Sequence, residues 1–139
     1  MKDLVNVRIC IDLDGVISRL RQPGQQYADL EPVAGAVEKL RQLRAAGHYL
    51  ILYTARHMKT CDGNVGKVVS RIGAVTLNWL ERHSITYDEI HFGKPHADVY
   101  IDDNALRFRG WDAIAGDGSD LPASAEQQAN EGGGMKADG

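Results

Sequence analysis

The run Ile9–Gly15 places two carboxylates one residue apart, at Asp12 and Asp14, directly after an apolar stretch. A buried strand explains the residues up to Ile11, but it does not explain paired acids. With the two-residue period of a strand, the two carboxylates share a face, and each disfavours the charge of the other unless a cation or a shared proton intervenes. The pattern indicates a metal site at the carboxyl end of a strand. The alternative is a polar strand end that leads into an Asp-Gly turn.

Three further segments also carry polar residues at the point where an apolar run stops. They are Tyr49–Tyr53 followed by Thr54, Ala55 and Arg56, then Glu89–Phe92 followed by Gly93, Lys94 and Pro95, and then Val99–Ile101 followed by Asp102 and Asp103. Ligands of open α/β sheets bind outside the carboxyl ends of the strands, so four such ends predict one common crevice.

Two amphipathic helices are predicted between the first three strands. The first begins at Pro32 and ends at Gly47, and the second extends from Val65 to Leu80 after an N-cap at Asn64. Strands that alternate with helices predict a parallel sheet with right-handed crossovers. The expected fold class is therefore α/β.

The remaining segments are short or poor in large apolar side chains. Residues 15–32 leave room only for a short flap, with a turn at Gln22–Gln25. Beyond about Gly116 the composition predicts a disordered tail. The expected organisation is one domain over residues 1–115 and a tail over residues 116–139.

Composition excludes several classes of protein. A chain of 139 residues with 43% apolar residues suits one domain with a core, and a net charge of -3 argues against a protein that binds nucleic acid independently of sequence. No apolar run approaches the roughly 18 residues of a membrane span and no secretory signal is apparent, so a cytoplasmic protein is expected. The two cysteines, Cys10 and Cys61, indicate neither a disulfide framework nor a zinc site.

The order DxDG, Thr, Lys and DD resembles the four motifs of the haloacid dehalogenase (HAD) superfamily of phosphatases, over roughly residues 5–108. The resemblance implies a three-layer Rossmann-like core, here capless because no segment is long enough for a cap domain. It also implies hydrolysis of a phosphomonoester through an aspartyl phosphate, with Asp12 as nucleophile and Asp14 as general acid and base. Thr54 and Lys94 would hold phosphoryl oxygens.

The same resemblance implies a magnesium site. Mg²⁺ would be held by the Asp12 carboxylate, the Asp14 backbone carbonyl and Asp102, with Asp103 acting directly or through water. Ligation by oxygen alone suits this ion.

A narrower resemblance appears after the second motif. The segments Thr54–Thr60 and Gly63–Lys67 are similar to those of the small phosphatases of bacterial capsule and surface-polysaccharide biosynthesis. Two features depart from that pattern: Val16 replaces a threonine, and the stretch His96–Asp98 is short. This resemblance implies a phosphorylated sugar or polyol as substrate. The expected substrate-binding residues are Gly15, Ala55, Arg56, Asn64 and Lys67.

Other functions remain open at this point. An open site beside a cationic loop would also suit a nucleotide or a polynucleotide end, and the same motifs could form a non-catalytic module that binds phosphate or metal. If the protein is an enzyme, its expected partner is a small phosphorylated metabolite. A site without a cap also predicts a homo-oligomer in which a second subunit covers it.

Overall fold

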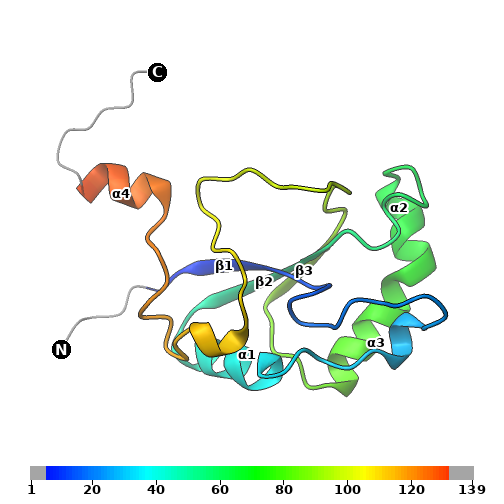
Figure 1. The fold of residues 1–139 in the computed structure, drawn as a ribbon, viewed down its shortest axis with the longest axis horizontal. Coiled ribbons are helices and arrows are strands. Elements are labelled where there is room, and N and C mark those ends of the chain that lie inside the picture. Colours follow the sequence, from blue (N-terminus) through cyan, green and yellow to red (C-terminus); the bar gives the residue numbers. More distant parts are fainter. Residues whose placement is uncertain (1–5, 132–139) are drawn as a thin grey trace.

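A computed structural model describes residues 6–131 of the protein (Figure 1). Three strands, β1 (Arg8–Asp12), β2 (Tyr49–Thr54) and β3 (Glu89–Phe92), form a parallel sheet in the order β1-β2-β3. The register places Asp12 beside Tyr53 and Thr54 beside Phe92, so the carboxyl ends of all three strands meet at one edge. This arrangement confirms the predicted α/β class with a parallel Rossmann-like sheet.

The helix between β1 and β2 is α1 (Ala36–Ala45). It begins at Ala36 rather than at the predicted Pro32, because Pro32 forms an isolated bridge with Ser18 and the left-handed Gly35 (φ 84°) precedes the first turn. Its end at Gly47 agrees with the prediction, since Gly47 adopts φ 99°, a conformation that favours glycine.

The helix between β2 and β3 is one continuous helical run in three parts: α2 (Val65–Val68), the π-helical turn η2 (Val69–Gly73) and α3 (Ala74–Arg82). The predicted N-cap is confirmed, because Asn64 Oδ1 accepts a hydrogen bond of 3.1 Å from the Lys67 backbone N–H. Within residues 6–131, no helix has the length and apolar character that crossing a membrane requires.

The core lies on the face of the sheet that Leu50 and Leu52 present. The side chains that fill it from α1 and α3 are Leu40, Leu43, Trp79 and Leu80, all essentially inaccessible to solvent. The two crossovers run in the same direction along the sheet, so right-handed connections bring both helices to this face. On the opposite face Arg8, Cys10 and Tyr49 are exposed.

The segment between β1 and α1 is a short flap over residues 15–32, as predicted, with a single 3-10 turn, η1 (Tyr27–Asp29). The turn at Gln22–Gln25 is confirmed by a 3.0 Å hydrogen bond from the Gln25 N–H to the Gln22 carbonyl. The base of the flap is tied to α3, because the Trp79 indole N–H donates to the Leu30 carbonyl at 2.7 Å.

The prediction of a disordered tail from Gly116 is wrong for the residues that the structure describes. His48 Nε2 lies 2.7 Å from the Asp117 carbonyl oxygen, and Leu121 packs against the core. Farther along, Ala125–Glu131 form helix α4. Residues 132–139 lie outside the described part of the chain. The glycine-rich composition predicted disorder, but Gly116 and Gly118 have no side chains, and this lets their backbone approach the domain closely.

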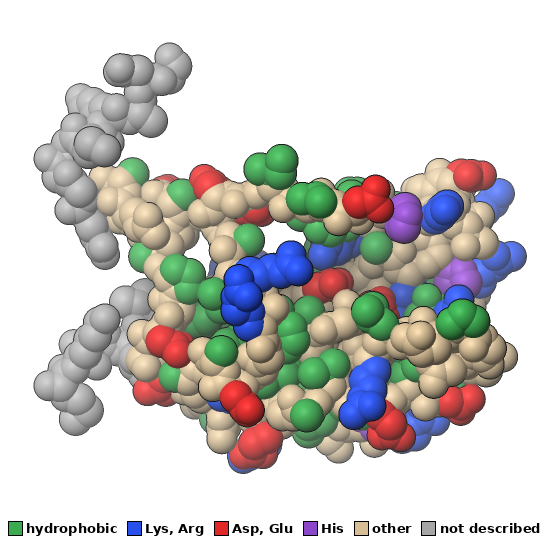
Figure 2. Space-filling model, viewed as in Figure 1, with side chains coloured by type: hydrophobic (Ala, Val, Ile, Leu, Met, Phe, Trp, Pro, Cys, Tyr) green, Lys and Arg blue, Asp and Glu red, His purple; other side chains and the backbone are tan. Residues whose placement is uncertain are grey.

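The predicted fourth strand is not formed. Residues 99–101 pair with no described strand, and their side chains are exposed, Val99 to 73% and Ile101 to 99%. The span between β3 and the 3-10 turn η3 (Trp111–Ala113) passes over the sheet, and a gap separates it from the body of the domain (Figures 1 and 2). Only residues 95–98 separate Lys94 from this run, whereas a parallel pairing needs a return crossover of about a dozen residues.

Candidate active site

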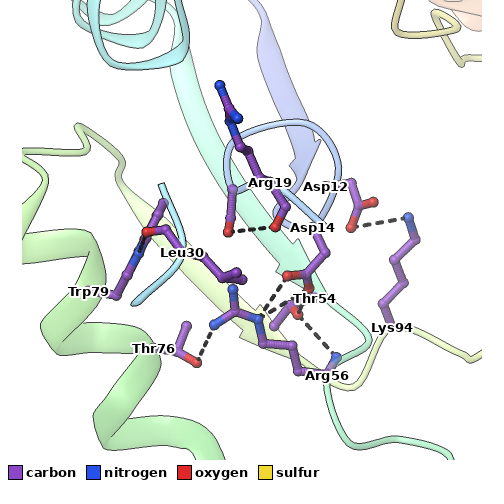
Figure 3. A network of polar contacts seen from close by, with 10 residues as sticks. Asp12, Asp14, Arg19, Leu30, Thr54, Arg56, Thr76, Trp79 and Lys94 are labelled. Atoms are coloured by element: carbon purple, nitrogen blue, oxygen red, sulfur yellow. Dashed lines mark hydrogen bonds and ion pairs between the residues drawn. The ribbon is translucent and has the colours of Figure 1, made fainter. Parts of the chain in front are cut away.

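Four of the predicted site residues come together at the carboxyl edge of the sheet (Figure 3). Asp12 is the last residue of β1, Asp14 follows it, Thr54 is the last residue of β2, and Lys94 follows β3. The backbone N–H groups of Gly93 and Lys94 both donate to the Thr54 carbonyl, at 3.2 and 3.1 Å. These bonds hold the turn after β3 against the end of β2.

Gly93 is required at this turn. It adopts φ 105°, and a Cβ atom there would lie 2.9 Å from Cγ2 of Val65, at the start of α2. The N-terminus of α2 therefore packs directly against the turn that carries Lys94.

The Asp12 carboxylate and the Lys94 ammonium face each other, with Nζ 3.6 Å from Oδ1. Burial raises the pKa of the Asp12 carboxyl and the Asp14 charge raises it further, while Lys94 opposes both; the net pKa shift is upward. Lys94 is also held by the ring of Tyr100, whose centroid lies 4.2 Å from Nζ. The site thus presents a partly desolvated, unusually basic carboxylate beside one cation.

The Asp14 carboxylate is held by two neighbours. The Thr54 hydroxyl donates to Oδ2 at 3.1 Å, and Arg56 Nε lies 2.9 Å from Oδ1 and 3.2 Å from Oδ2. Thr54 is fully buried and its oxygen also accepts the Arg56 backbone N–H at 3.1 Å. In this arrangement the Thr54 hydroxyl hydrogen points at Asp14, so its predicted contact with a phosphoryl oxygen is not preformed.

Two residues around Arg56 were not singled out from the sequence. Thr76 of α3 accepts a hydrogen bond of 3.2 Å from Nη1, and the ring of Tyr27 lies 4.2 Å from the guanidinium carbon. Thr76 is fully buried. A sequence signal existed for it, because Thr76 lies four residues from both Ile72 and Leu80 on the buried face of the helix.

The other predicted substrate-binding residues have local roles in the structure. The Gly15 N–H donates to the Ser18 carbonyl at 2.7 Å, the Ala55 carbonyl accepts the Met58 N–H, and Asn64 caps α2. Lys67 is exposed, and no hydrogen bond or ion pair among the described residues joins it or Asn64 to the acidic pair. Their binding roles stay predictions.

The predicted magnesium ligands are only partly assembled. Asp12 and Asp14 lie together, but Asp102 and Asp103 are exposed on the unpaired span, where Asp102 Oδ1 accepts the Asn104 N–H. No cluster of three or more Asp, Glu, His or Cys side chains suited to a metal occurs in residues 6–131. Because residues 99–101 form no strand, Asp102 and Asp103, which follow them, are not brought to the carboxyl end of β1.

Comparisons with known proteins give one family match and one similar solved structure. The profile of the family described as 5' nucleotidase, deoxy (pyrimidine), cytosolic type C protein matches residues 18–116. A structural-genomics target from Vibrio cholerae has a similar solved structure, with a TM-score of 0.66 and 35% sequence identity, over 72% of this chain and 82% of that one. No curated protein matches. The matched range includes Thr54, Arg56 and Lys94 and begins after Asp14.

Proposed function

This chain belongs to the family of cytosolic type C 5' nucleotidases and is a phosphatase of the HAD type, and we propose that its substrate is a nucleotide. The observation that carries the proposal is the family match over residues 18–116. It favours the nucleotide alternative over the sugar or polyol phosphate that the capsule-enzyme resemblance implied. That narrower resemblance is not confirmed.

The chemistry follows from the two carboxylates at the end of β1. Asp12 attacks the phosphorus atom, and the bond to the 5'-oxygen of the nucleotide's sugar breaks as an aspartyl phosphate forms. Asp14, which must carry a proton for this step, gives it to the leaving oxygen. Asp14 then takes a proton from the water that attacks the aspartyl phosphate, which releases inorganic phosphate and restores the Asp12 carboxylate. Lys94 offsets the negative charge of Asp12 and of the phosphoryl group.

The donor set is compatible with Mg²⁺ as cofactor. The oxygens of Asp12 and Asp14 are ligands of the kind this ion takes. Burial raises the pKa of Asp12 and the Asp14 charge raises it further, and a bound cation would favour the carboxylate form against both. The chemistry supplied by the ion is neutralisation of charge on the transferring phosphoryl group. Asp102 and Asp103 complete the proposed set only if residues 99–103 move toward the open edge of β1. A covering second subunit also stays a prediction.

A substrate panel tests the proposed function. With Mg²⁺ present, kcat/KM for nucleoside 5'-monophosphates is expected to exceed that for sugar and polyol phosphates by at least about tenfold, equivalent to about 1.4 kcal/mol. The panel should also contain oligonucleotides with a 3'-phosphate. Turnover confined to sugar phosphates or to oligonucleotide ends would contradict the nucleotide proposal, and no turnover of any phosphomonoester would favour a binding module.

Removal of metal ions by chelation is expected to abolish the phosphatase activity, and added Mg²⁺ is expected to restore it. If Asp102 ligates the ion, Asp102→Asn raises the Mg²⁺ concentration needed for half-maximal activity by about tenfold or more, since a lost ligand weakens binding by at least the amount seen for outer-shell residues. Asp98→Asn is the matched control, an acid on the same exposed span. Full activity after exhaustive chelation would exclude a required metal, and equal behaviour of the two variants would remove Asp102 from the set.

A further inference from the structure

We propose that Arg56 is a positioning residue for Asp14. Its guanidinium fixes the Asp14 carboxyl in the orientation from which that group exchanges protons with the leaving oxygen and with water. Arg56 does not bind the phosphoryl group itself. The inference rests on the proposed function, because it takes the acid-base role of Asp14 as its premise, and it replaces the substrate-binding role that was predicted for Arg56.

The first support is the geometry around Asp14. Arg56 Nε contacts both carboxylate oxygens, at 2.9 and 3.2 Å, and the Thr54 hydroxyl adds a third contact at 3.1 Å. The Arg56 backbone N–H donates to the same Thr54 oxygen at 3.1 Å, so the three residues form a closed ring of hydrogen bonds (Figure 3). Charge-assisted bonds of this kind are stronger than neutral ones, and together they hold the carboxyl group in one plane.

The second support is the burial of the arginine. Its side chain is 0% exposed, whereas the Asp14 side chain is 23% exposed. Asp14 therefore keeps a solvent-exposed surface that a substrate can reach, while Arg56 keeps none. A group so buried acts on the reaction through Asp14.

The third support is what holds the guanidinium from the other side. Nη1 donates to the Thr76 hydroxyl at 3.2 Å, and the ring of Tyr27 lies 4.2 Å from Cζ. These contacts connect Asp14 to α3 and to the anchored base of the flap. A lysine has a single ammonium group and cannot reach Asp14 and Thr76 together, so the planar fork of arginine is required.

Arg56 also carries a feature that is costly for a purely structural residue. Its Nη2 atom is buried and has no hydrogen-bond partner among the described residues. Native structures leave few buried donors unpaired, and those that persist tend to occur at functional sites. The position is therefore explained better by the orientation that the guanidinium gives to the Asp14 carboxyl group than by packing.

The test compares two leaving groups in the full-length protein. Arg56→Lys is expected to lower kcat/KM for a nucleoside monophosphate by about 100-fold or more, because an alkoxide leaving group needs the proton from Asp14. For 4-nitrophenyl phosphate, whose leaving group departs without a proton, the loss is expected to stay below about tenfold. KM for the nucleotide should change by less than about threefold, because binding is not the function that is removed.

Two further variants keep the result interpretable. Thr76→Val leaves the Arg56–Asp14 pair in place but removes the bond to Nη1, and it should show a smaller loss with the same preference for 4-nitrophenyl phosphate. Arg44→Lys is the matched control, since Arg44 forms an exposed ion pair with Asp88, and it should leave both activities unchanged. Thermal unfolding checks that each variant is folded; if Arg56→Lys does not fold, Thr76→Val decides.

The outcomes separate the two proposals. Equal losses on both substrates, or a loss that appears mainly in KM, would overturn the positioning role while leaving the phosphatase assignment intact. A wild-type protein that hydrolyses 4-nitrophenyl phosphate and other monoesters but no nucleotide would overturn the proposed substrate. In that case the alkyl phosphate with the highest kcat/KM would replace the nucleotide in the leaving-group comparison. A protein that hydrolyses no phosphomonoester would overturn both.

Discussion

Asp12→Asn is expected to lower kcat by at least about 1,000-fold, equivalent to about 4 kcal/mol in the activation barrier, because an amide is a far poorer nucleophile than a carboxylate. The Asp12→Asn protein should still fold. Burial and the Asp14 charge raise the pKa of Asp12, so the folded state favours the protonated carboxyl. The stability that this group contributes is present below its ordinary pKa and is lost as the pH rises through the raised pKa. At neutral pH the neutral amide should therefore raise the unfolding temperature.

Steady-state assays and thermal unfolding at neutral and acidic pH check both parts of this prediction. The difference in unfolding temperature between the variant and the wild type should shrink as the pH falls, since Asp12 then becomes neutral in the wild type as well. Asp98→Asn is the control for an exposed acid. A folded Asp12→Asn protein that keeps more than about a tenth of the activity would exclude Asp12 as the nucleophile.

Lys94→Met is expected to lower kcat/KM by about 100- to 1,000-fold, the usual cost of removing one preorganised electrostatic group from a reacting centre. Lys94 is the cation within 3.6 Å of Asp12, and it lowers the pKa of that carboxyl. Without it, the pKa of Asp12 rises further. Because the nucleophile reacts as the carboxylate, the acidic limb of the pH-rate profile should move to higher pH in the variant.

A pH series of kcat/KM measures the displacement of this limb. Lys59→Met serves as the control, because Lys59 is an exposed lysine on the loop after β2. An acidic limb that does not move in Lys94→Met would show that the ionisation of Asp12 does not govern the rate. A loss of equal size in Lys59→Met would point to general electrostatic attraction of the substrate.

The sheet and its helices were predictable because their signals are local. A run such as Leu50–Leu52 is apolar enough to form a buried strand, and the spacing of Val65, Val68, Ile72 and Leu80 fits one face of a helix. The crossover rule then places the strand ends together, which is why Asp12, Asp14, Thr54 and Lys94 meet.

Of the two misplaced elements, one depends on a contact between distant residues and the other on the length of a connection. The tail was predicted as disordered from its composition, yet the glycine-bounded segment at Asp117 lies against His48, 69 residues earlier. The strand expected at Val99–Ile101 has strand-like composition, but the chain that leads to it is too short for a parallel return. Composition and periodicity carry no information about either constraint.

For the site too, local signals were predictable from the sequence and long-range contacts were not. The amino-acid sequence alone determined that two carboxylates, a hydroxyl and an ammonium stand at strand ends, because each follows directly from the residues beside it. Only the tertiary structure decided that the Arg56 side chain is fully buried against Asp14, since that depends on the position of Thr76 on α3 and of Tyr27 in the flap. Side chains far apart in the chain meet only when helices have packed on the sheet, and packing is a property of the whole domain.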